Sequence, residues 1–204
     1  MAISYPLSVP TTIGLAQVEF TASNAVALSQ SPFTYESQVH AYPGQSWSVS
    51  VTLPALNRAF MEPWITFLLS LRGQYGTFLM GDPNGKVPLG AGGGSPVVAN
   101  HSDYTITFTG GPVSTTGYLL AGDYIQLGTG SGATLHKVLT DVSTDVSGDG
   151  SIDVWPAPRR TLTVGEAITT SNTVGRFRLA SNQSSWSITE SCKYGISFDC
   201  IEAI

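Results

Sequence analysis

The chain has 204 residues, of which 42% are hydrophobic and 11% are charged, and its formal net charge is −5. This length and apolar content are enough for one large or two small folded domains, which excludes an intrinsically disordered chain. A direct nucleic-acid reader is also disfavoured, because no Lys/Arg cluster is present to neutralise phosphates on one face.

The N-terminal sequence MAISYPLSVP has no basic segment followed by an apolar one, so we expect no export signal in it. Eighteen consecutive apolar residues occur nowhere, so we also expect no membrane span. Residues 17–42 contain short β-like runs interrupted by Ser-Asn, Ser-Pro and Pro-Gly. Residues 45–53 alternate regularly, and both segments are predicted as strands.

One helix is predicted between Asn57 and Gly73. Its buried face has helical spacing and consists of Phe60, Trp64, Phe67, Leu68 and Leu71. A second apolar row, Met61, Ile65 and Leu69, is covered either by the rest of the chain or by a neighbouring subunit. Pro63 lacks the N–H that would bond to Ala59, so we expect a kink, or a helix that begins near Met61.

A short strand over residues 77–80 leads to the Gly-rich stretch GAGGGSP at residues 90–96, which is the predicted domain boundary. Six short strands are then predicted, at residues 104–109, 118–120, 124–127, 134–139, 151–155 and 161–164. Strand alternation returns at residues 176–179 and 186–202. We therefore predict a mainly β fold with one main helix, in which a small β-barrel or sandwich, residues 95–173, is inserted into a discontinuous β-sandwich formed by residues 1–94 and 174–204.

The two cysteines, Cys192 and Cys200, are eight residues apart. On one extended strand they would lie about 26 Å apart and could not bond, whereas a hairpin would bring them together. We expect free, buried thiols, as in a protein that folds in a reducing cytosol.

A calcium loop is suggested by Asp145, Ser147 and Asp149, which occupy its first, third and fifth positions. Pro156 stands where the loop needs a bidentate Glu, so the pattern fails. The three histidines, His40, His101 and His136, are scattered along the chain. We therefore expect no metal site and no cofactor.

Catalytic patterns are equally incomplete. Gly-x-Ser-x-Gly does not occur, GTGSG at residues 128–132 lacks the Lys-Ser/Thr of a phosphate loop, and Asp123 and Glu166 lie on separate segments. We expect no enzymatic activity. The aromatic residues that could stack on a sugar are Tyr5, Tyr35, Tyr42, Trp47 and Trp155. Within the predicted insertion, Trp155 and Tyr124 are the candidate ligand platform, although aromatics on strands usually belong to the core.

Several motifs resemble the tail-hub domain of long-tailed bacteriophages, which distal tail proteins and related minor tail proteins share. They are Leu-Pro before the helix, LRGQYGTFL and GDPNG after it, and the final WSIT and ISFDCIE strands. This resemblance covers residues 15–88 and 174–204. AGDYIQLGTGSGATLHKVL and DVWPAPRR, within residues 118–160, are similar to inserted units of phage tail proteins. Pro63 departs from the smoother helix of the family.

The resemblance implies a structural virion protein that is folded in the host bacterial cytoplasm and built into the tail tip. It would form a homo-oligomeric ring, a hexamer by analogy, between the tail tube protein and other tail-tip or baseplate hub proteins. Phage DNA would pass through the channel without specific binding, and the low, acidic charge suits such a channel. Met61, Ile65 and Leu69 are the candidate subunit contact. The alternatives are a carbohydrate-binding β module for host adsorption and a tail-associated hydrolase, which lacks a catalytic set.

Overall fold

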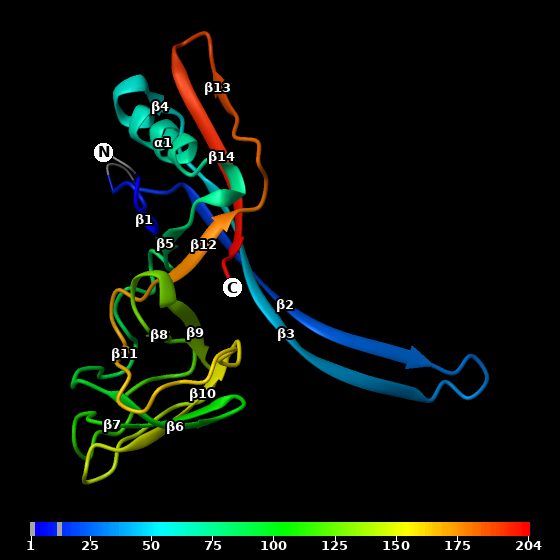
Figure 1. Cartoon of the computed structure of the whole chain (residues 1–204), viewed down its shortest axis with the longest axis vertical. Coiled ribbons are helices and arrows are strands. Elements are labelled where there is room, and N and C mark those ends of the chain that lie inside the picture. Colours follow the sequence, from blue (N-terminus) through cyan, green and yellow to red (C-terminus); the bar gives the residue numbers. More distant parts are fainter. Residues whose placement is uncertain (1–2, 12–13) are drawn as a thin grey trace.

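The structure is a computed structural model that describes residues 3–11 and 14–204. It is mainly β, with 43% strand, two sheets and one α-helix in the described residues. Figure 1 shows three parts: a sheet with the helix beside it, a compact second sheet, and a long hairpin that leaves the body of the molecule. The predicted fold class is confirmed.

The first sheet has the strand order β1-β5-β12-β14-β3-β2, and β4 and β13 also pair with β14. Only β1 and β5 pair in parallel among the described strands. Its strands are β1 (Leu7–Ser8), β2 (Gln17–Gln30), β3 (Ser37–Thr52), β4 (Leu56–Asn57), β5 (Phe78–Met80), β12 (Gly175–Leu179), β13 (Trp186–Ile188) and β14 (Lys193–Glu202). We refer to this sheet and its helix as the main unit.

Helix α1 (Arg58–Ser70) covers the core of the main unit and is followed by a short 3₁₀ turn, η1 (Gly73–Tyr75). Asn57 precedes it in an extended conformation, without a side-chain capping hydrogen bond. Pro63 lies inside the helix, which nevertheless begins at Arg58, so the expected later start near Met61 is wrong. The six buried apolar residues of this segment are Met61, Trp64, Ile65, Phe67, Leu68 and Leu71.

The apolar arc of α1 is rotated relative to the prediction. Phe60, placed on the buried face by its spacing, is 48% exposed, whereas Met61 and Ile65 are 0% and 6% exposed. Met61 and Ile65 belong to the protein's own core, so the prediction that they form a subunit contact is wrong. Leu69 is exposed. Phe60 and Met61 are neighbours in the first helical turn, so the buried face of the helix passes through Met61 and leaves Phe60 in solvent.

The second sheet forms what we refer to as the inserted unit, with the strand order β11-β8-β9-β10-β7-β6. Its elements are β6 (Val97–Ser102), β7 (Thr105–Thr109), β8 (Tyr124–Leu127), the 3₁₀ turn η2 (Gly130–Gly132), β9 (Thr134–Val138), β10 (Gly150–Trp155) and β11 (Ile168–Thr169). Backbone bonds from Val98 N–H to Glu166 O (2.8 Å) and from Ile168 N–H to Pro96 O (2.9 Å) join its two margins. The sheet is therefore nearly closed around a core of its own.

Two predicted strands of this unit are absent. Residues 161–164 form an irregular loop, and Leu119 makes only an isolated bridge with Val142. Both segments nevertheless contribute buried side chains, since Leu119 and Leu162 are 0% and 5% exposed. In these two segments, apolar residues between turn-forming residues correctly indicated burial in the core but wrongly indicated strands.

The β2–β3 hairpin is much longer than the sequence suggested. Instead of short runs over residues 17–42, β2 and β3 pair continuously from Gln17↔Thr52 to Gln30↔Ser37. One irregularity occurs, where Ala25 lies opposite residues 42–44, and this is where Pro-Gly falls. We define the arm as residues 25–44, the part of the hairpin beyond the Asn24↔Gln45 pair.

Both cysteines are free thiols. Cys200 is buried on β14, as expected, and burial raises its pKa to about 12. Cys192 is exposed in the turn before β14, so the expectation of a buried thiol is wrong for this residue. Across residues 3–11 and 14–204, no helix has the length and apolar content needed to cross a bilayer.

Candidate functional site

The arm presents an apolar strip to solvent. Its register places Val26 opposite Ala41 and Leu28 opposite Val39, so all four side chains share one face. Val26, Leu28 and Val39 are 54%, 68% and 62% exposed. Side chains of this kind are normally withdrawn from water, so the strip marks a surface that a partner can cover.

The strip continues a face that is already buried at the base of the hairpin. Val18 and Val51 pair there, as do Phe20 and Val49, and these residues pack against the core of the main unit. The opposite face of the arm carries Ala27, Ser29, Gln38 and His40. The branched aliphatic side chains of the arm therefore lie on the face that continues the buried one, while the exposed Tyr42 ring packs edge-on against His40, and the chain itself covers neither face.

The tip of the arm is the turn between Ser31 and Glu36, which is closed by the backbone bond from Ser31 N–H to Glu36 O (2.9 Å). Phe33 and Tyr35 in this turn are 91% and 75% exposed. Glu36 is the one charged side chain of residues 25–44 at neutral pH. Two large aromatic groups and one carboxylate are thus presented farthest from the body (Figure 1).

A polar network holds the base of the arm against the inserted unit. The Oδ1 atom of Asn24 accepts hydrogen bonds from Trp155 Nε1 (2.8 Å) and from Gln45 Nε2 (3.1 Å). Gln45 Oε1 accepts the backbone N–H of Ala157 (2.8 Å), and Gln45 Nε2 also donates to the Tyr104 hydroxyl (3.2 Å). Because Gln45 is buried, these bonds fix the direction in which the arm leaves the molecule.

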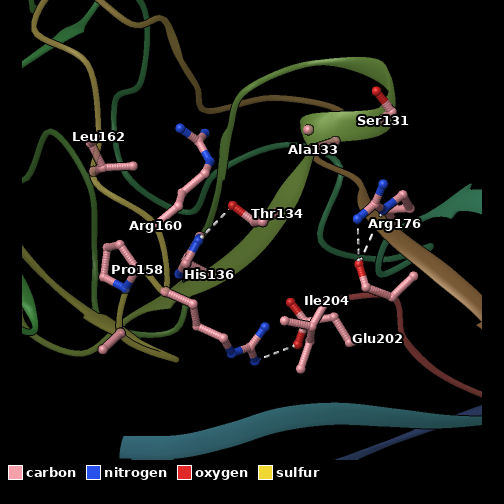
Figure 2. A pocket seen from close by; sticks show the side chains of 14 residues that line it. Ser131, Ala133, Thr134, His136, Pro158, Arg160, Leu162, Arg176, Glu202 and Ile204 are labelled. Carbon is pink, nitrogen blue, oxygen red and sulfur yellow. Dashed lines mark hydrogen bonds and ion pairs between the residues drawn. The ribbon is translucent and has the colours of Figure 1, made fainter.

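A cavity of about 270 Å³ lies where the two units meet, between β9, the loop after β10, and strands β12 and β14. Figure 2 shows His136, Arg160, Arg176 and Glu202 around it. Each arginine is already paired: Arg159 with Glu202 (2.8 Å), Arg160 with Glu166, and Arg176 with the Ala203 carbonyl (2.9 Å). The guanidinium groups therefore join segments of the fold, and the cavity is best explained as part of the junction.

His136 lines this cavity and is 2% exposed. Its Nδ1 lies 2.6 Å from the Pro156 carbonyl, which can only accept, so Nδ1 carries the proton. Nε2 of the neutral ring lies 2.9 Å from the Thr134 hydroxyl and accepts a hydrogen bond from it. Burial lowers the pKa of His136 to about 4, so the ring is neutral at pH 7 and both nitrogens are occupied.

The residues of the failed calcium pattern form a self-contained turn. Asp145 Oδ1 accepts the backbone N–H groups of Ser147 (2.8 Å) and Asp149 (2.9 Å). The bond from Asp149 and then that from Ser147 lower the pKa of the Asp145 carboxyl. Within residues 3–11 and 14–204, no three His, Cys, Asp or Glu side chains gather as metal ligands would.

Asp123 and Glu166, the two carboxylates that the sequence places on separate segments, serve separate local roles. Asp123 accepts three backbone N–H groups, from Leu89 (2.6 Å), Gly90 (3.1 Å) and Leu120 (2.8 Å). Glu166 pairs with Arg160, and the hydrogen bond from this guanidinium lowers the pKa of the Glu166 carboxyl. Neither carboxylate is placed against the other.

The predicted ligand platform is not formed as expected. Tyr124 is 6% exposed, and Lys137 Nζ lies 4.1 Å from the centre of its ring, so the ring offers no open face and this part of the prediction is wrong. Trp155 is half-buried and packs edge-on against Trp47, with 4.5 Å between the ring centres. Its indole N–H donates a hydrogen bond to Asn24. Its role in the structure is to brace the arm.

The arm is the feature that sequence reasoning missed. Only part of its signal was present: Val39 lies between the polar Gln38 and His40 after the Ser-Pro turn, whereas before the turn alanines flank Val26 and the first polar neighbour of Leu28 is Ser29. A predicted hairpin would have paired these two segments and placed their apolar side chains on one face. The exposure of that face could not have been predicted, because the same alternation of residues occurs whether or not another part of the protein covers the face.

Comparison of the chain with protein-family models gives no match, and comparison with curated proteins gives none either.

Proposed function

We propose that this protein is a structural component of a bacteriophage tail, in which copies of the chain form a ring that joins the end of the tail tube to the tail tip or baseplate. The observation that carries the proposal is the apolar strip of the arm, Val26, Leu28, Val39 and Ala41, which is uncovered in the single chain. The resemblance of the main unit to tail-hub domains supplies the biological setting.

An isolated two-stranded ribbon is marginally stable in water, and β2 lies at the margin of its sheet with unpaired backbone groups along its outer side. Covering the strip with another copy removes apolar surface from water and stabilises the ribbon. A contact of this kind joins different surfaces of successive copies, and such head-to-tail contacts close into rings when the rotation allows.

The ring proposed here is a hexamer by analogy with the family, with the tail tube protein on one side and tail-tip or hub proteins on the other. The net charge of −5 suits a channel through which DNA passes without being held. In this account the protein is located in the virion, at the tail tip, and its work is assembly, with no catalytic step.

Association of purified chains tests this proposal. Leu28→Asp places a carboxylate in the apolar strip, and we expect it to weaken association by at least about tenfold, because the charge must be desolvated in the interface. Ser29→Asp adds the same charge one residue along, on the opposite face, and is the matched control. Both positions are exposed, so the fold of the single chain tolerates either change.

Light scattering coupled to size exclusion, over a range of concentrations, measures the mass of each variant. Wild type and Ser29→Asp are expected to form the same closed oligomer, while Leu28→Asp remains a monomer at concentrations where they assemble. A wild-type chain that is monomeric throughout, or equal association of all three proteins, would contradict the proposal.

A further inference from the structure

A groove lies at the margin of the main sheet, where β1 and β5 run side by side. It has a volume of about 540 Å³ and is lined mainly by apolar side chains, among them Val9, Leu15, Leu79, Met80 and Val174. Leu79 and Met80 belong to β5, and Ser8 of β1 also lines the groove. This is a concave apolar surface of a size that several side chains of another chain can enter.

The groove and the arm stand at opposite margins of the same sheet. In the order β1-β5-β12-β14-β3-β2, the groove belongs to the first two strands and the arm to the last two. Figure 1 shows the arm leaving the molecule on the side away from β1 and β5. The arm of a chain therefore points away from its own groove (Figure 1).

We propose that the groove at the β1–β5 margin receives the arm of a second copy of this chain. The inference rests on the proposed ring and names the surface by which one subunit holds the next. It makes the contact heterologous, so that every copy in the ring gives one arm and accepts one.

Shape and charge both fit this occupant. The strip of the arm is one ribbon wide and extends about 20 Å from the bulge at Ala25, so a groove can cover it from both sides. Among the described residues, Lys86 is the one charged side chain that lines the groove, and Glu36 is the one charged side chain of the arm. Neither has an ionic partner within the described part of the chain.

A seated arm places its tip, with Phe33 and Glu36, at one end of the groove, where the carboxylate can meet Lys86. Burial of Val26, Leu28 and Val39 supplies the apolar contact, and the Glu36–Lys86 pair fixes the direction of insertion. Two arms packed against each other would instead leave both grooves open and leave Lys86 without a carboxylate from the arm.

Disulfide trapping between subunits tests the proposal. In a Cys192→Ser background, which removes the exposed native thiol, Glu36→Cys and Lys86→Cys are made as separate chains and mixed under mild oxidation. We expect a cross-linked dimer in the mixture, a ladder of higher species when both changes are in one chain, and none with either single variant alone. The control is Glu36→Cys mixed with Val146→Cys, and this mixture should form no cross-link. Val146 is 82% exposed and lies in the inserted unit, away from the groove.

The mass of the same samples, measured before oxidation, separates the possible failures. Oligomers that form without a 36–86 cross-link overturn the groove assignment and leave the proposed ring standing. Cross-linking of Glu36→Cys to itself identifies arm-to-arm pairing and also overturns the assignment. Samples that are monomeric before oxidation and do not cross-link overturn both the ring and the groove.

Discussion

Glu202 links the two units through a buried carboxylate. Its Oε2 lies 2.8 Å from Arg159 Nη2 and accepts the backbone N–H of Trp47 at 3.2 Å, while its side chain is 4% exposed. A charge so buried depends on its partners, because water cannot replace them. This contact spans 43 residues of sequence, and no local pattern around either residue could have predicted it.

Replacing this carboxylate measures how much it contributes to the stability of the fold. Glu202→Gln is expected to lower the free energy of unfolding by about 3 kcal/mol, near the lower end for breaking a buried pair, since the Arg159 side chain keeps 23% exposure. Glu166→Gln is the matched control and should cost about 1 kcal/mol or less, because its partner Arg160 is 40% exposed. Denaturant unfolding of the two variants measures both values, and equal losses would contradict this ranking.

His136 makes stability depend on pH in a defined direction. Its pKa is about 4 in the folded chain and about 6.5 when unfolded, so between these values the unfolded chain binds the proton and the folded chain does not. The contribution of the neutral His136 ring to the free energy of unfolding is therefore complete above about pH 6.5 and is lost as the pH falls toward 4. It amounts to about 3 kcal/mol on an order-of-magnitude scale.

The measurement is the unfolding free energy of wild type and of His136→Asn at several values between pH 7.5 and pH 4.5. Carboxylates titrate in both proteins, so the difference between the two curves isolates the imidazole. We expect the wild type to lose stability more steeply than the variant as pH falls. Parallel curves would show that the imidazole has the same pKa in the folded and unfolded chains, which would contradict this prediction.

At the scale of elements, α1 and the arm show what a sequence pattern can and cannot convey. Helical spacing predicted the existence of α1, and the capping residue Asn57 marked its start, whereas the later start near Met61 expected from Pro63 was wrong. The same pattern placed Phe60 inside and left Met61 undecided, since the width of the covering sheet is a tertiary property. The arm was missed for a related reason: alternation reports which face is apolar, but not whether anything covers it.

The arm should therefore change its amide exchange on assembly. In the unassembled chain, the amides of residues 26–41 are held only by each other's strand, whereas residues 17–23 and 46–52 belong to the packed sheet. We expect at least about tenfold faster exchange in the arm than at its base. Assembly should slow exchange in the arm and leave the base unchanged, as measured by mass spectrometry of the peptides. An arm with the same exchange in both states would not be at a subunit contact.

At the scale of the whole molecule, the chain enters and leaves the inserted unit at neighbouring points. Asn172 N–H donates to Lys86 O at 2.6 Å, so the two connecting segments run side by side. The Gly-rich sequence at residues 90–96 indicated this division, and the strands of the second sheet fall between residues 97 and 169. Leu135 and Tyr124 of the inserted unit nevertheless pack into the core of the main unit, a contact that composition could not reveal.

Excision tests how independent the two units are. Replacing residues 95–173 with a short Gly/Ser linker is expected to leave a folded main unit with a lower melting temperature, because Leu135 and Tyr124 no longer fill its core. The excised segment should fold as well, since its core is its own. Circular dichroism and thermal unfolding of the two pieces check this. If both are unfolded, the chain is one indivisible domain.

Negative-stain electron microscopy of the purified protein shows whether many copies of this chain surround a channel. We expect closed rings of uniform size with an open centre, in which each subunit gives its arm to one neighbour and receives the arm of the other. The same rings should be lost in Leu28→Asp and kept in Ser29→Asp. Single particles without a central hole, or open filaments in place of rings, would contradict the account.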